Sequence, residues 1–346
     1  MWWRTPASRA HRSSRARRAR LAILRPVRLV QRTTLRPEDR AARDFLAIEG
    51  LPLEQLRALL AQAEELLPVA VGDARGERTL EGRVVANLFF EDSTRTRVSF
   101  EIAADRLGAA VVNLGSSGSS ASKGETLVDT ARNIDAMGVD AIVVRTSISG
   151  GAALVARSVG CPVINAGDGR HEHPTQALLD LLALRLRLGK LDGKRVAIVG
   201  DIANSRVARS ATHALVALGA HVDIVGPPSL VPSEFDRLAQ GAGSVSITHD
   251  IDSIIGEVDA IMMLRIQMER AAASGIAPDY RTAYGLTVAR RSRLRREAVI
   301  LHPGPVNRGL EIDDEVADDL ASSVILAQVS CGVAARMAVL LRAMPS

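Results

Sequence analysis

The sequence predicts an α/β protein with two doubly wound parallel-sheet domains and a cleft between them. Two observations predict this class: short apolar runs alternate with helical patterns along most of the chain, and the alternation forms two series that meet near Gly189. Strands that alternate with helices pair in parallel sheets. Ligands of such sheets bind at the carboxyl ends of the strands, so we expect functional residues directly after the apolar runs.

The first series begins with a helix near Pro37 and an amphipathic helix over 53–67, in which leucines recur at helical spacing. Four apolar runs of strand length follow. The expected strands are 83–90, 109–114, 141–145 and 162–165, and the expected helices are 98–107, 125–137, 151–159 and 174–188. A tight turn is expected at 166–169.

The second series starts at Lys194. Its expected strands are 195–199, 221–225, 245–248, 260–264 and 298–301, and its expected helices are 205–218, 251–255 and 322–344. We therefore expect a first domain of residues 37–180 completed by the C-terminal helix at 322–346, and a second domain of residues 181–321.

Charge is distributed unevenly along the chain. Residues 1–36 carry 11 Arg and no acidic residue, whereas the remainder holds 33 of the 44 basic residues and all 39 acidic ones, a net charge of −6. The body therefore lacks the basic footprint of a nucleic-acid-binding domain. The composition of residues 1–36 predicts a disordered basic extension. Its role stays open between a dispensable extension from an upstream start codon, an organellar transit peptide and a nucleic-acid-binding arm.

The cysteine content favours a reducing compartment. Cys161 and Cys331 form no close pair and no metal-ligand spacing. No apolar run reaches the length that a membrane span needs. We therefore expect a cytoplasmic protein.

The most informative stretch is 91–101, Glu-Asp-Ser-Thr-Arg-Thr-Arg-Val-Ser-Phe-Glu, which joins the first strand to its helix. Ser93, Thr94, Arg95 and Thr96 crowd the turn. Free backbone N–H groups and the helix dipole favour an anion there, and guanidinium groups match phosphate oxygens. The stretch predicts a phosphate cradle built without glycine. The alternative is an ordinary capped helix with solvated arginines.

Polar residues also follow the later strands of the first series and the first strand of the second. Arg145 ends a strand, and His173 and Gln176 lie on one face of a helix start, where they suit a small carbonyl and amide. Arg206 follows Gly200-Asp201, which is not a dinucleotide fingerprint.

The last strands carry the remaining candidates. Arg265 and Gln267 follow the strand at 260–264, and two arginines, Arg206 and Arg265, suit a dicarboxylate. Pro303, Gly304 and Pro305 lie in an irregular loop after the last strand, and the carbonyls of that loop can face the cleft. The His-x-His pair of 171–173 has no third ligand, so neither a metal nor another cofactor is expected. Each of these residues, taken alone, is also compatible with a solvated strand end.

Together these blocks resemble the aspartate/ornithine carbamoyltransferases, and within that family the aspartate branch. The resemblance runs from about Pro37 to the C-terminus. It rests on 93–97, 123–126 (Lys-Gly-Glu-Thr), Arg145, 173–176 (His-Pro-Thr-Gln), 199–201 with Arg206, 264–267 (Leu-Arg-Ile-Gln) and 302–309, in the family's order. The ornithine enzymes usually carry a His-Cys-Leu-Pro loop where this sequence has His-Pro-Gly-Pro at 302–305.

The resemblance implies a one-carbon transferase that joins carbamoyl phosphate and L-aspartate to give N-carbamoyl-L-aspartate and phosphate, the committed step of pyrimidine synthesis. It implies three groups of site residues. The first group, Ser93, Thr94, Arg95 and Thr96, binds the phosphate. In the second group, Thr96, Arg145 and His173 polarise the carbamoyl oxygen, and Gln176 and the carbonyls of 303–305 hold the carbamoyl amide. The third group, Lys123, Arg206, Arg265 and Gln267, holds aspartate.

The resemblance also implies an obligate trimer, because the family's loop residues that match Ser119 and Lys123 enter the neighbouring chain's site. The family occurs as bare trimers, with nucleotide-binding regulatory chains, or with dihydroorotase. Two rival functions remain open: a sister carbamoyltransferase acting on another amine such as ornithine, and a non-catalytic paralogue.

Overall fold

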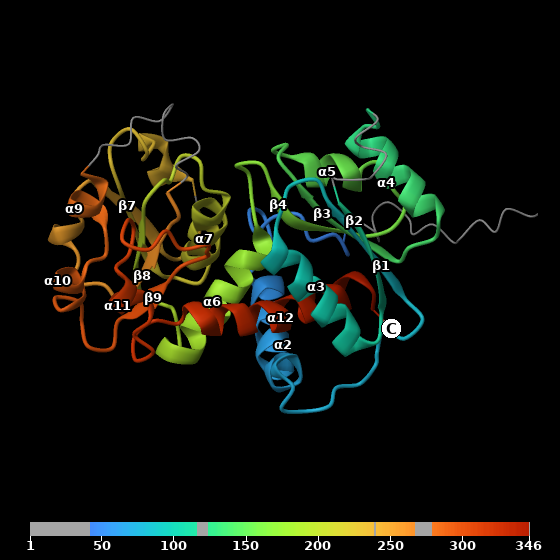
Figure 1. The fold of residues 1–346 in the computed structure, drawn as a ribbon, viewed down its shortest axis with the longest axis horizontal. Helices are drawn as coiled ribbons and strands as arrows, with labels where there is room; N and C mark the ends of the chain where they lie inside the picture. The colour runs from blue at the N-terminus through green and yellow to red at the C-terminus, as the bar shows by residue number, and fades with distance from the viewer. Residues whose placement is uncertain (1–41, 116–123, 239, 267–278, 346) are drawn as a thin grey trace, which may run out of the picture. The chain divides into compact units, whose positions relative to one another are not determined.

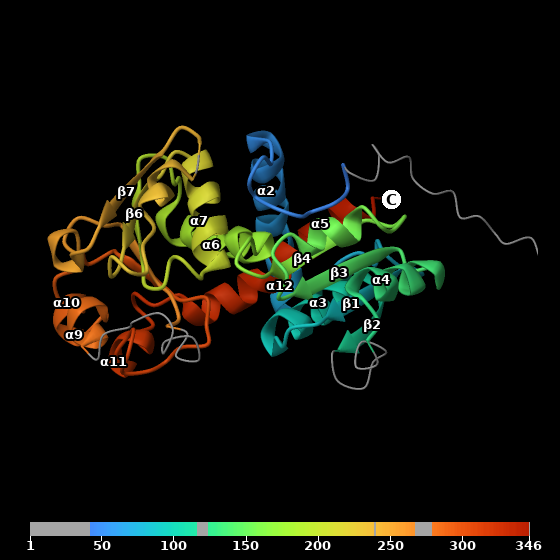
Figure 2. The same ribbon diagram turned by 90° about the horizontal axis from the view of Figure 1, so that it is seen from above.

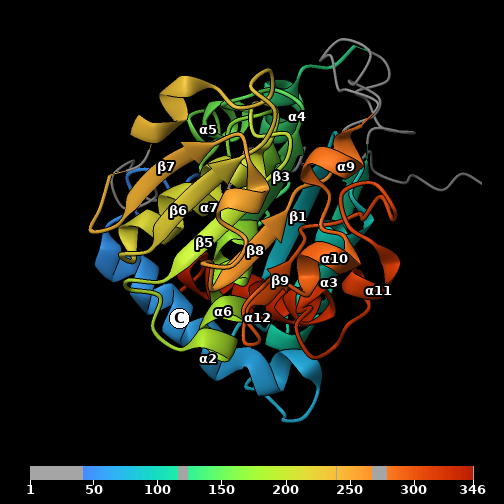
Figure 3. The ribbon, with the colours of Figure 1, turned by 90° about the vertical axis from the view of Figure 1, so that its left-hand side faces the viewer.

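The computed structural model describes residues 42–115, 124–238, 240–266 and 279–345. Within these ranges the named strands form two sheets, and every pairing between them is parallel. The first sheet, on the right in Figure 1, has the order β2 (Ala110–Gly115), β1 (Val84–Phe89), β3 (Ala141–Thr146) and β4 (Val163–Asp168). The second has the order β7 (Ser244–Thr248), β6 (His221–Val225), β5 (Arg195–Val199), β8 (Ala260–Met263) and β9 (Val299–Leu301) (Figure 3). The predicted fold class is confirmed.

The expected helices are present, with bounds shifted by a few residues at most ends. They are α2 (Leu53–Val71), α3 (Thr94–Leu107), α4 (Leu127–Ala136), α5 (Gly151–Ala156), α6 (Pro174–Leu188), α7 (Arg206–Ala217), η3 (Ile251–Ser253) and α12 (Ile325–Ala343). The sequence analysis missed η2 (Ser233–Arg237), α9 (Tyr280–Tyr284), α10 (Val288–Arg291) and α11 (Asp314–Ala317), which are too short to give a periodic pattern.

Two local expectations differ from the structure. The tight turn expected at 166–169 is wrong, because β4 continues through Asp168 and the chain turns only after it. Residues 42–52 form turns and an isolated bridge between Phe45 and Ile164 rather than a helix. The part of the expected first helix before residue 42 lies outside the described residues.

Alternate side chains of β1 face two different cores. Val85 and Phe89 belong to one cluster with residues of α2, α3, α6 and α12, whereas Ala86 and Leu88 belong to another with residues of α4 and α5. Successive side chains of a strand point to opposite faces of a sheet, so helices cover both faces of this sheet at β1, β3 and β4, whereas the edge strand β2 is largely exposed. That burial explains why the strands read as continuous apolar runs in the sequence.

The larger core joins the two series. It includes Val196 and Ile198 of β5 and Met262 of β8, in the second sheet, together with the buried face of the first sheet. α6 and α12 contribute to this core, and α12 packs against α2, α3 and α6 (Figure 2). α6, which follows the last strand of the first series, and α12, which follows the last strand of the second, therefore both belong to the core that the two series share.

α12 corrects one expectation from the sequence. By length and composition alone it is apolar enough to cross a membrane. However, most of the helix is buried inside the protein, and Arg336 lies within it with its side chain buried. The core helix of a globular unit passes the same test, because it must be apolar on most of its faces.

Two leucines of α6 provide a test of this packing. Leu182 is fully buried in the shared core, whereas Leu186, one turn later, is 45% exposed. We expect Leu182→Ala to lower the free energy of unfolding by about 2–5 kcal/mol, because it removes buried methyl groups and leaves a cavity. Leu186→Ala is the matched control and should cost less than about 0.5 kcal/mol. Urea denaturation measures both, and equal losses would contradict the described packing.

Candidate active site

The carboxyl ends of strands from both sheets surround a cavity of about 810 Å³. The cavity is lined by residues that follow β1, β4, β5, β8 and β9, by Arg145 near the end of β3, and by residues of α3, α6, α7 and α12. Every predicted site residue within the described ranges lines it: Ser93, Thr94, Arg95, Thr96, Arg145, His173, Gln176, Arg206, Arg265, Pro303, Gly304 and Pro305. The predicted Ser119, Lys123 and Gln267 lie outside the described residues.

The N-terminus of α3 has the character of an anion site. Ser93 is the N-cap in an extended conformation, and its side chain makes no capping hydrogen bond. The first turn of the helix contains no acidic residue. The first backbone N–H groups of a helix have no intrahelical partner, and the helix dipole adds partial positive charge there. Phosphate is a suitable partner for these groups, as the sequence predicts.

Arg95 extends this anion site toward the loop after β9. Its Nη2 donates to the carbonyl oxygen of Pro303 at 3.4 Å. Gly304 adopts φ +65°, and a Cβ atom there would lie 2.7 Å from Nη1 of Arg95. A glycine is needed here both for the left-handed backbone and for the close approach of the guanidinium. The loop of 303–305 and the phosphate cradle are therefore in contact.

A single carboxylate joins two further arginines of the cavity. Arg145 Nη2 donates to Glu91 Oε1 at 2.7 Å, and Arg206 Nη1 donates to Glu91 Oε2 at 3.1 Å. Nη2 of Arg206 also donates to Glu91 Oε1. Burial raises the pKa of Glu91, but hydrogen bonds and charges from Arg206 and Arg145 outweigh it, so the net pKa is lowered. Glu91 is thus ionised at neutral pH and screens the two guanidinium groups from each other.

The cavity carries more positive charge than Glu91 neutralises. Burial, together with the charge of Arg206, lowers the pKa of Arg145 to about 10, against the raising effect of Glu91. Burial lowers the pKa of Arg336 to about 9, with Arg145 contributing. The pKa of Arg95 is also lowered, by burial and by the charge of Arg265. All remain charged at pH 7, so an anionic ligand would relieve both the burial and the mutual repulsion of these groups.

His173 enters the cavity as a neutral side chain. It is the N-cap of α6, and its backbone N–H donates to Ser210 Oγ at 2.8 Å, which fixes the start of the helix to α7. Burial lowers the pKa of His173 well below its ordinary value, and the charges of Arg145, Arg206 and Arg336 lower it further. A neutral imidazole can donate one hydrogen bond to a ligand oxygen without adding charge to the site.

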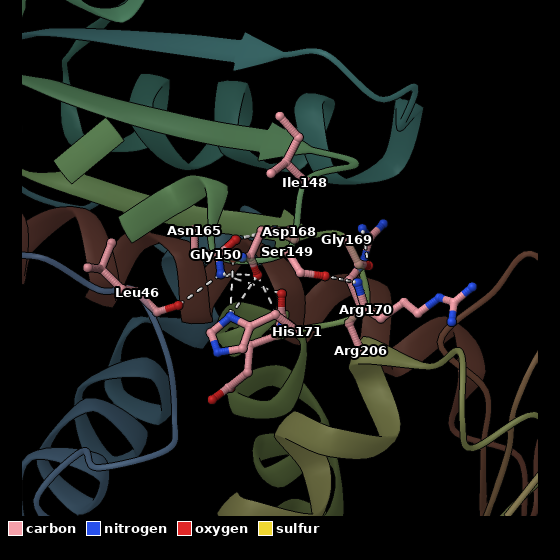
Figure 4. A network of polar contacts seen from close by, with 12 residues as sticks. Leu46, Ile148, Ser149, Gly150, Asn165, Asp168, Gly169, Arg170, His171 and Arg206 are labelled. Carbon is pink, nitrogen blue, oxygen red and sulfur yellow. Dashed lines mark hydrogen bonds and ion pairs between the residues drawn. The ribbon is translucent and has the colours of Figure 1, made fainter. Parts of the chain in front are cut away.

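Asp168 organises the segment that leads into α6 (Figure 4). Its carboxylate accepts hydrogen bonds from the backbone of Gly150 at 2.9 Å, from Asn165 Nδ2 at 2.9 Å and from the backbone of Glu172 at 3.1 Å. The ring of His171 lies 3.2 Å from the same carboxylate. His171 is therefore turned to Asp168 and is not among the residues that line the cavity.

A different group has metal-ligand spacing: Glu49, Glu172 and His213 place one ligand atom each within 4.8 Å of one another. The Glu172 carboxylate already accepts from the backbone N–H groups of Ile48 at 2.8 Å and Glu49 at 2.9 Å and from Ser210 Oγ at 2.7 Å. These hydrogen bonds explain why the carboxylate is buried: it joins the start of α6 to the loop before α2 and so has a structural role. The pair of His171 and His173 does not belong to this group.

Four cavity or near-cavity residues were not assigned by the sequence analysis: Glu91, Asp180, Gln328 and Arg336. Glu91 lies two residues before Ser93 in the stretch 91–101, so its position could have identified it as a site residue. Asp180 lies four residues after Gln176 and so on the same helical face. Gln328 and Arg336 interrupt an otherwise apolar helix, which is a weaker signal.

Comparison with known proteins agrees with this geometry. Residues 43–186 match the model of the aspartate/ornithine carbamoyltransferase carbamoyl-P binding domain, and residues 192–343 match that of the Asp/Orn binding domain. The fold and site are thus those of a two-domain carbamoyltransferase. The chain belongs to the aspartate/ornithine carbamoyltransferase family.

Relatives in sequence and in structure can be compared in more detail. The aspartate carbamoyltransferase catalytic subunit of Myxococcus xanthus is 52% identical over 300 residues, which cover 86% of this chain and 98% of that protein. The same subunit of Granulibacter bethesdensis is 51% identical, with 86% and 93% covered.

Two solved structures show a close likeness to this fold. Aspartate transcarbamoylase of Trypanosoma cruzi, in complex with N-(phosphonacetyl)-L-aspartic acid, has a TM-score of 0.78 at 30% identity and covers 86% of this chain and 95% of its own. Ornithine carbamoyltransferase of Pyrococcus furiosus has a TM-score of 0.78 at 30% identity, with 87% and 96% covered. The fold alone therefore does not separate the two substrate branches.

The Glu91 bridge can be tested against a surface pair. Glu91→Gln removes the charge that holds Arg145 and Arg206, and we expect catalytic activity to fall at least about tenfold, the equivalent of one charged hydrogen bond of about 1.5 kcal/mol. Glu101→Gln is the matched control, because Glu101 pairs with Arg97 at 3.7 Å on the exposed face of α3 and such pairs contribute little. Steady-state assays of both variants decide the matter, and equal effects would contradict a functional role for the bridge.

Proposed function

We propose that this chain is an aspartate carbamoyltransferase, which converts carbamoyl phosphate and L-aspartate into N-carbamoyl-L-aspartate and phosphate in pyrimidine synthesis. The observation that carries the proposal is the single cavity in which an anion-binding helix start, a neutral His173 and two separate arginine groups converge. The relatives at about 50% identity are named for this activity.

The phosphate of carbamoyl phosphate binds at Ser93, Thr94, Arg95 and Thr96. The carbamoyl oxygen then lies toward Thr96, Arg145 and His173, which stabilise the negative charge that develops when the amine attacks. Each well-placed donor of this kind contributes roughly 3–4 kcal/mol to catalysis. The geometry needs no protein nucleophile, because the amine of aspartate attacks the carbonyl carbon and the departing phosphate takes its proton.

Arg206 and Arg265 bind the carboxylates of aspartate, with Gln267 and Lys123 as further expected partners. Guanidinium groups pair with carboxylates in a bidentate geometry, which orients the amine as well as binding the substrate. Ornithine, whose side chain ends in an amine, would leave one of these guanidinium groups without its anion. The His-Pro-Gly-Pro sequence of 302–305 supports the same choice, because the ornithine enzymes usually carry a thiol in that loop.

We propose that residues 37–180 with the C-terminal helix 322–346 form the domain that binds carbamoyl phosphate, and that residues 181–321 form the domain that binds aspartate. The packing of α12 against α2, α3 and α6 supports assignment of the C-terminal helix to the first domain. The enzyme acts in the cytoplasm. Cys161 and Cys331 are both buried free thiols, as expected for a protein of a reducing compartment.

The amine acceptor is the decisive test of the proposed reaction. We expect the purified protein to carbamoylate aspartate with a kcat/KM at least about a hundredfold above that for ornithine, because ornithine leaves buried polar groups unpaired. Assays with both amines at equal carbamoyl phosphate measure this ratio. A preference for ornithine would indicate the sister activity, and no carbamoylation of either amine would indicate a non-catalytic paralogue.

The active enzyme is a homotrimer in which each site takes Ser119 and Lys123 from the adjacent chain. The resemblance supports this assembly, because the family's loop residues that match Ser119 and Lys123 enter the neighbouring chain's site. The family also occurs in larger assemblies, with regulatory chains or with a dihydroorotase.

Chain mixing tests the shared site. Lys123→Ala and Arg95→Ala should each be inactive alone, because each removes a cation from every site. When the two variants are unfolded together and refolded, mixed trimers should regain part of the activity, since some sites then combine an intact Lys123 with an intact Arg95. Refolding each variant separately is the control. Mixed trimers without any recovered activity would place both residues in one chain's site.

A further inference from the structure

Asp180 lies behind the cavity, on the inner face of α6. Its side chain is 2% exposed. Its Oδ1 atom accepts a hydrogen bond from Nε2 of Gln176, one turn earlier in α6, at 2.9 Å. The same Oδ1 accepts from Nε2 of Gln328 in α12 at 2.7 Å. One oxygen atom therefore holds the amino groups of two glutamine side chains.

These two hydrogen bonds determine which way each amide points. An amide whose NH₂ group is held by a carboxylate presents its carbonyl oxygen on the other side. For Gln328 that oxygen is engaged, because Oε1 accepts from the backbone N–H of His302 at 3.0 Å. For Gln176, which lines the cavity, Oε1 is the amide atom left for a ligand.

The same carboxylate thus reaches two acceptors of the site by two routes. It acts directly on Gln176, and through Gln328 it holds His302, the residue that begins the loop of 303–305. Both Gln176 Oε1 and the carbonyls of that loop accept hydrogen bonds, and neither can donate one. A ligand group placed between them must carry hydrogen-bond donors, and an NH₂ group offers two.

A contribution to the stability of the fold does not explain why a carboxyl group occupies position 180. Its second oxygen, Oδ2, is buried and has no hydrogen-bond partner among the described residues. Burial raises the pKa of Asp180 to about 7, against the lowering effect of Gln328, Gln176 and Arg336. A buried carboxyl with an unsatisfied oxygen costs free energy that an apolar side chain of similar size would not.

We propose that Asp180 is a positioning residue that orients Gln176 and, through Gln328, the loop of 303–305, so that the site selects an acyl phosphate whose acyl group carries an NH₂. The proposal rests on the proposed function and adds the residue that sets its donor selectivity. Carbamoyl phosphate has this NH₂ group, whereas acetyl phosphate has a methyl group in the same place and an identical phosphate.

The test compares binding of carbamoyl phosphate, acetyl phosphate and inorganic phosphate by calorimetry to the full chain. The wild type should prefer carbamoyl phosphate to acetyl phosphate. Asp180→Leu and Asp180→Ala remove the acceptor. In each variant the ratio of the affinities for carbamoyl phosphate and acetyl phosphate should fall roughly tenfold, the size of a single hydrogen bond. Inorganic phosphate should bind all variants equally, which also shows that the variants are folded.

Two further variants separate orientation from structure. Asp180→Asn keeps an oxygen that can accept from both glutamines, so it should retain most of the preference. Gln176→Leu removes the oriented amide and should lose the preference as Asp180→Leu does. An unchanged preference in folded Asp180→Leu or Asp180→Ala, a loss in Asp180→Asn as large as theirs, or an unchanged preference in Gln176→Leu would each overturn the proposal. Failure of the wild type to bind carbamoyl phosphate would instead overturn the proposed function.

Discussion

The paired hydrogen bonds of Glu91 to Arg145 and Arg206 are the interaction on which the site depends. Glu91 follows β1, Arg145 ends β3, and Arg206 begins α7 after the first strand of the second sheet. Without an anion between them, the two guanidinium groups would repel each other at the point where the carboxyl ends of the two sheets meet. One carboxylate therefore connects the two halves of the cavity and still leaves net positive charge for anionic ligands.

The environment of each arginine explains how one cavity can treat two anions differently. Arg95 lies beside the start of α3 and under the loop of 303–305, where backbone N–H groups and hydroxyls surround it. Arg206 shares Glu91 with Arg145 and also donates to the carbonyl of Gly169. A phosphate finds many donors within one turn of chain, whereas a carboxylate at Arg206 meets one guanidinium already held in place.

Much of this could be predicted from the sequence, because parallel strands give continuous apolar runs and their carboxyl ends collect the polar residues. The phosphate cradle was visible because 93–97 is contiguous. Asp180 was not, because its partner Gln328 is 148 residues away in the chain and a single Asp on an apolar helix gives no pattern. The end of β4 at Asp168 was missed for a similar reason. Gly167 and Asp168 read as a turn, whereas Asp168 pairs with Thr146 of β3 and its carboxylate accepts hydrogen bonds from distant parts of the chain.

The position of α12 has a consequence for the growing chain on the ribosome. The helix packs on α2, α3 and α6, yet it is translated only after the whole of the second sheet. Domains commonly fold in order from the N-terminus during synthesis. Here the parts of α2 and α3 that α12 covers gain their partner only after about residue 343 has been made. The core of the N-terminal half is therefore completed last, when the final helix of the chain is added.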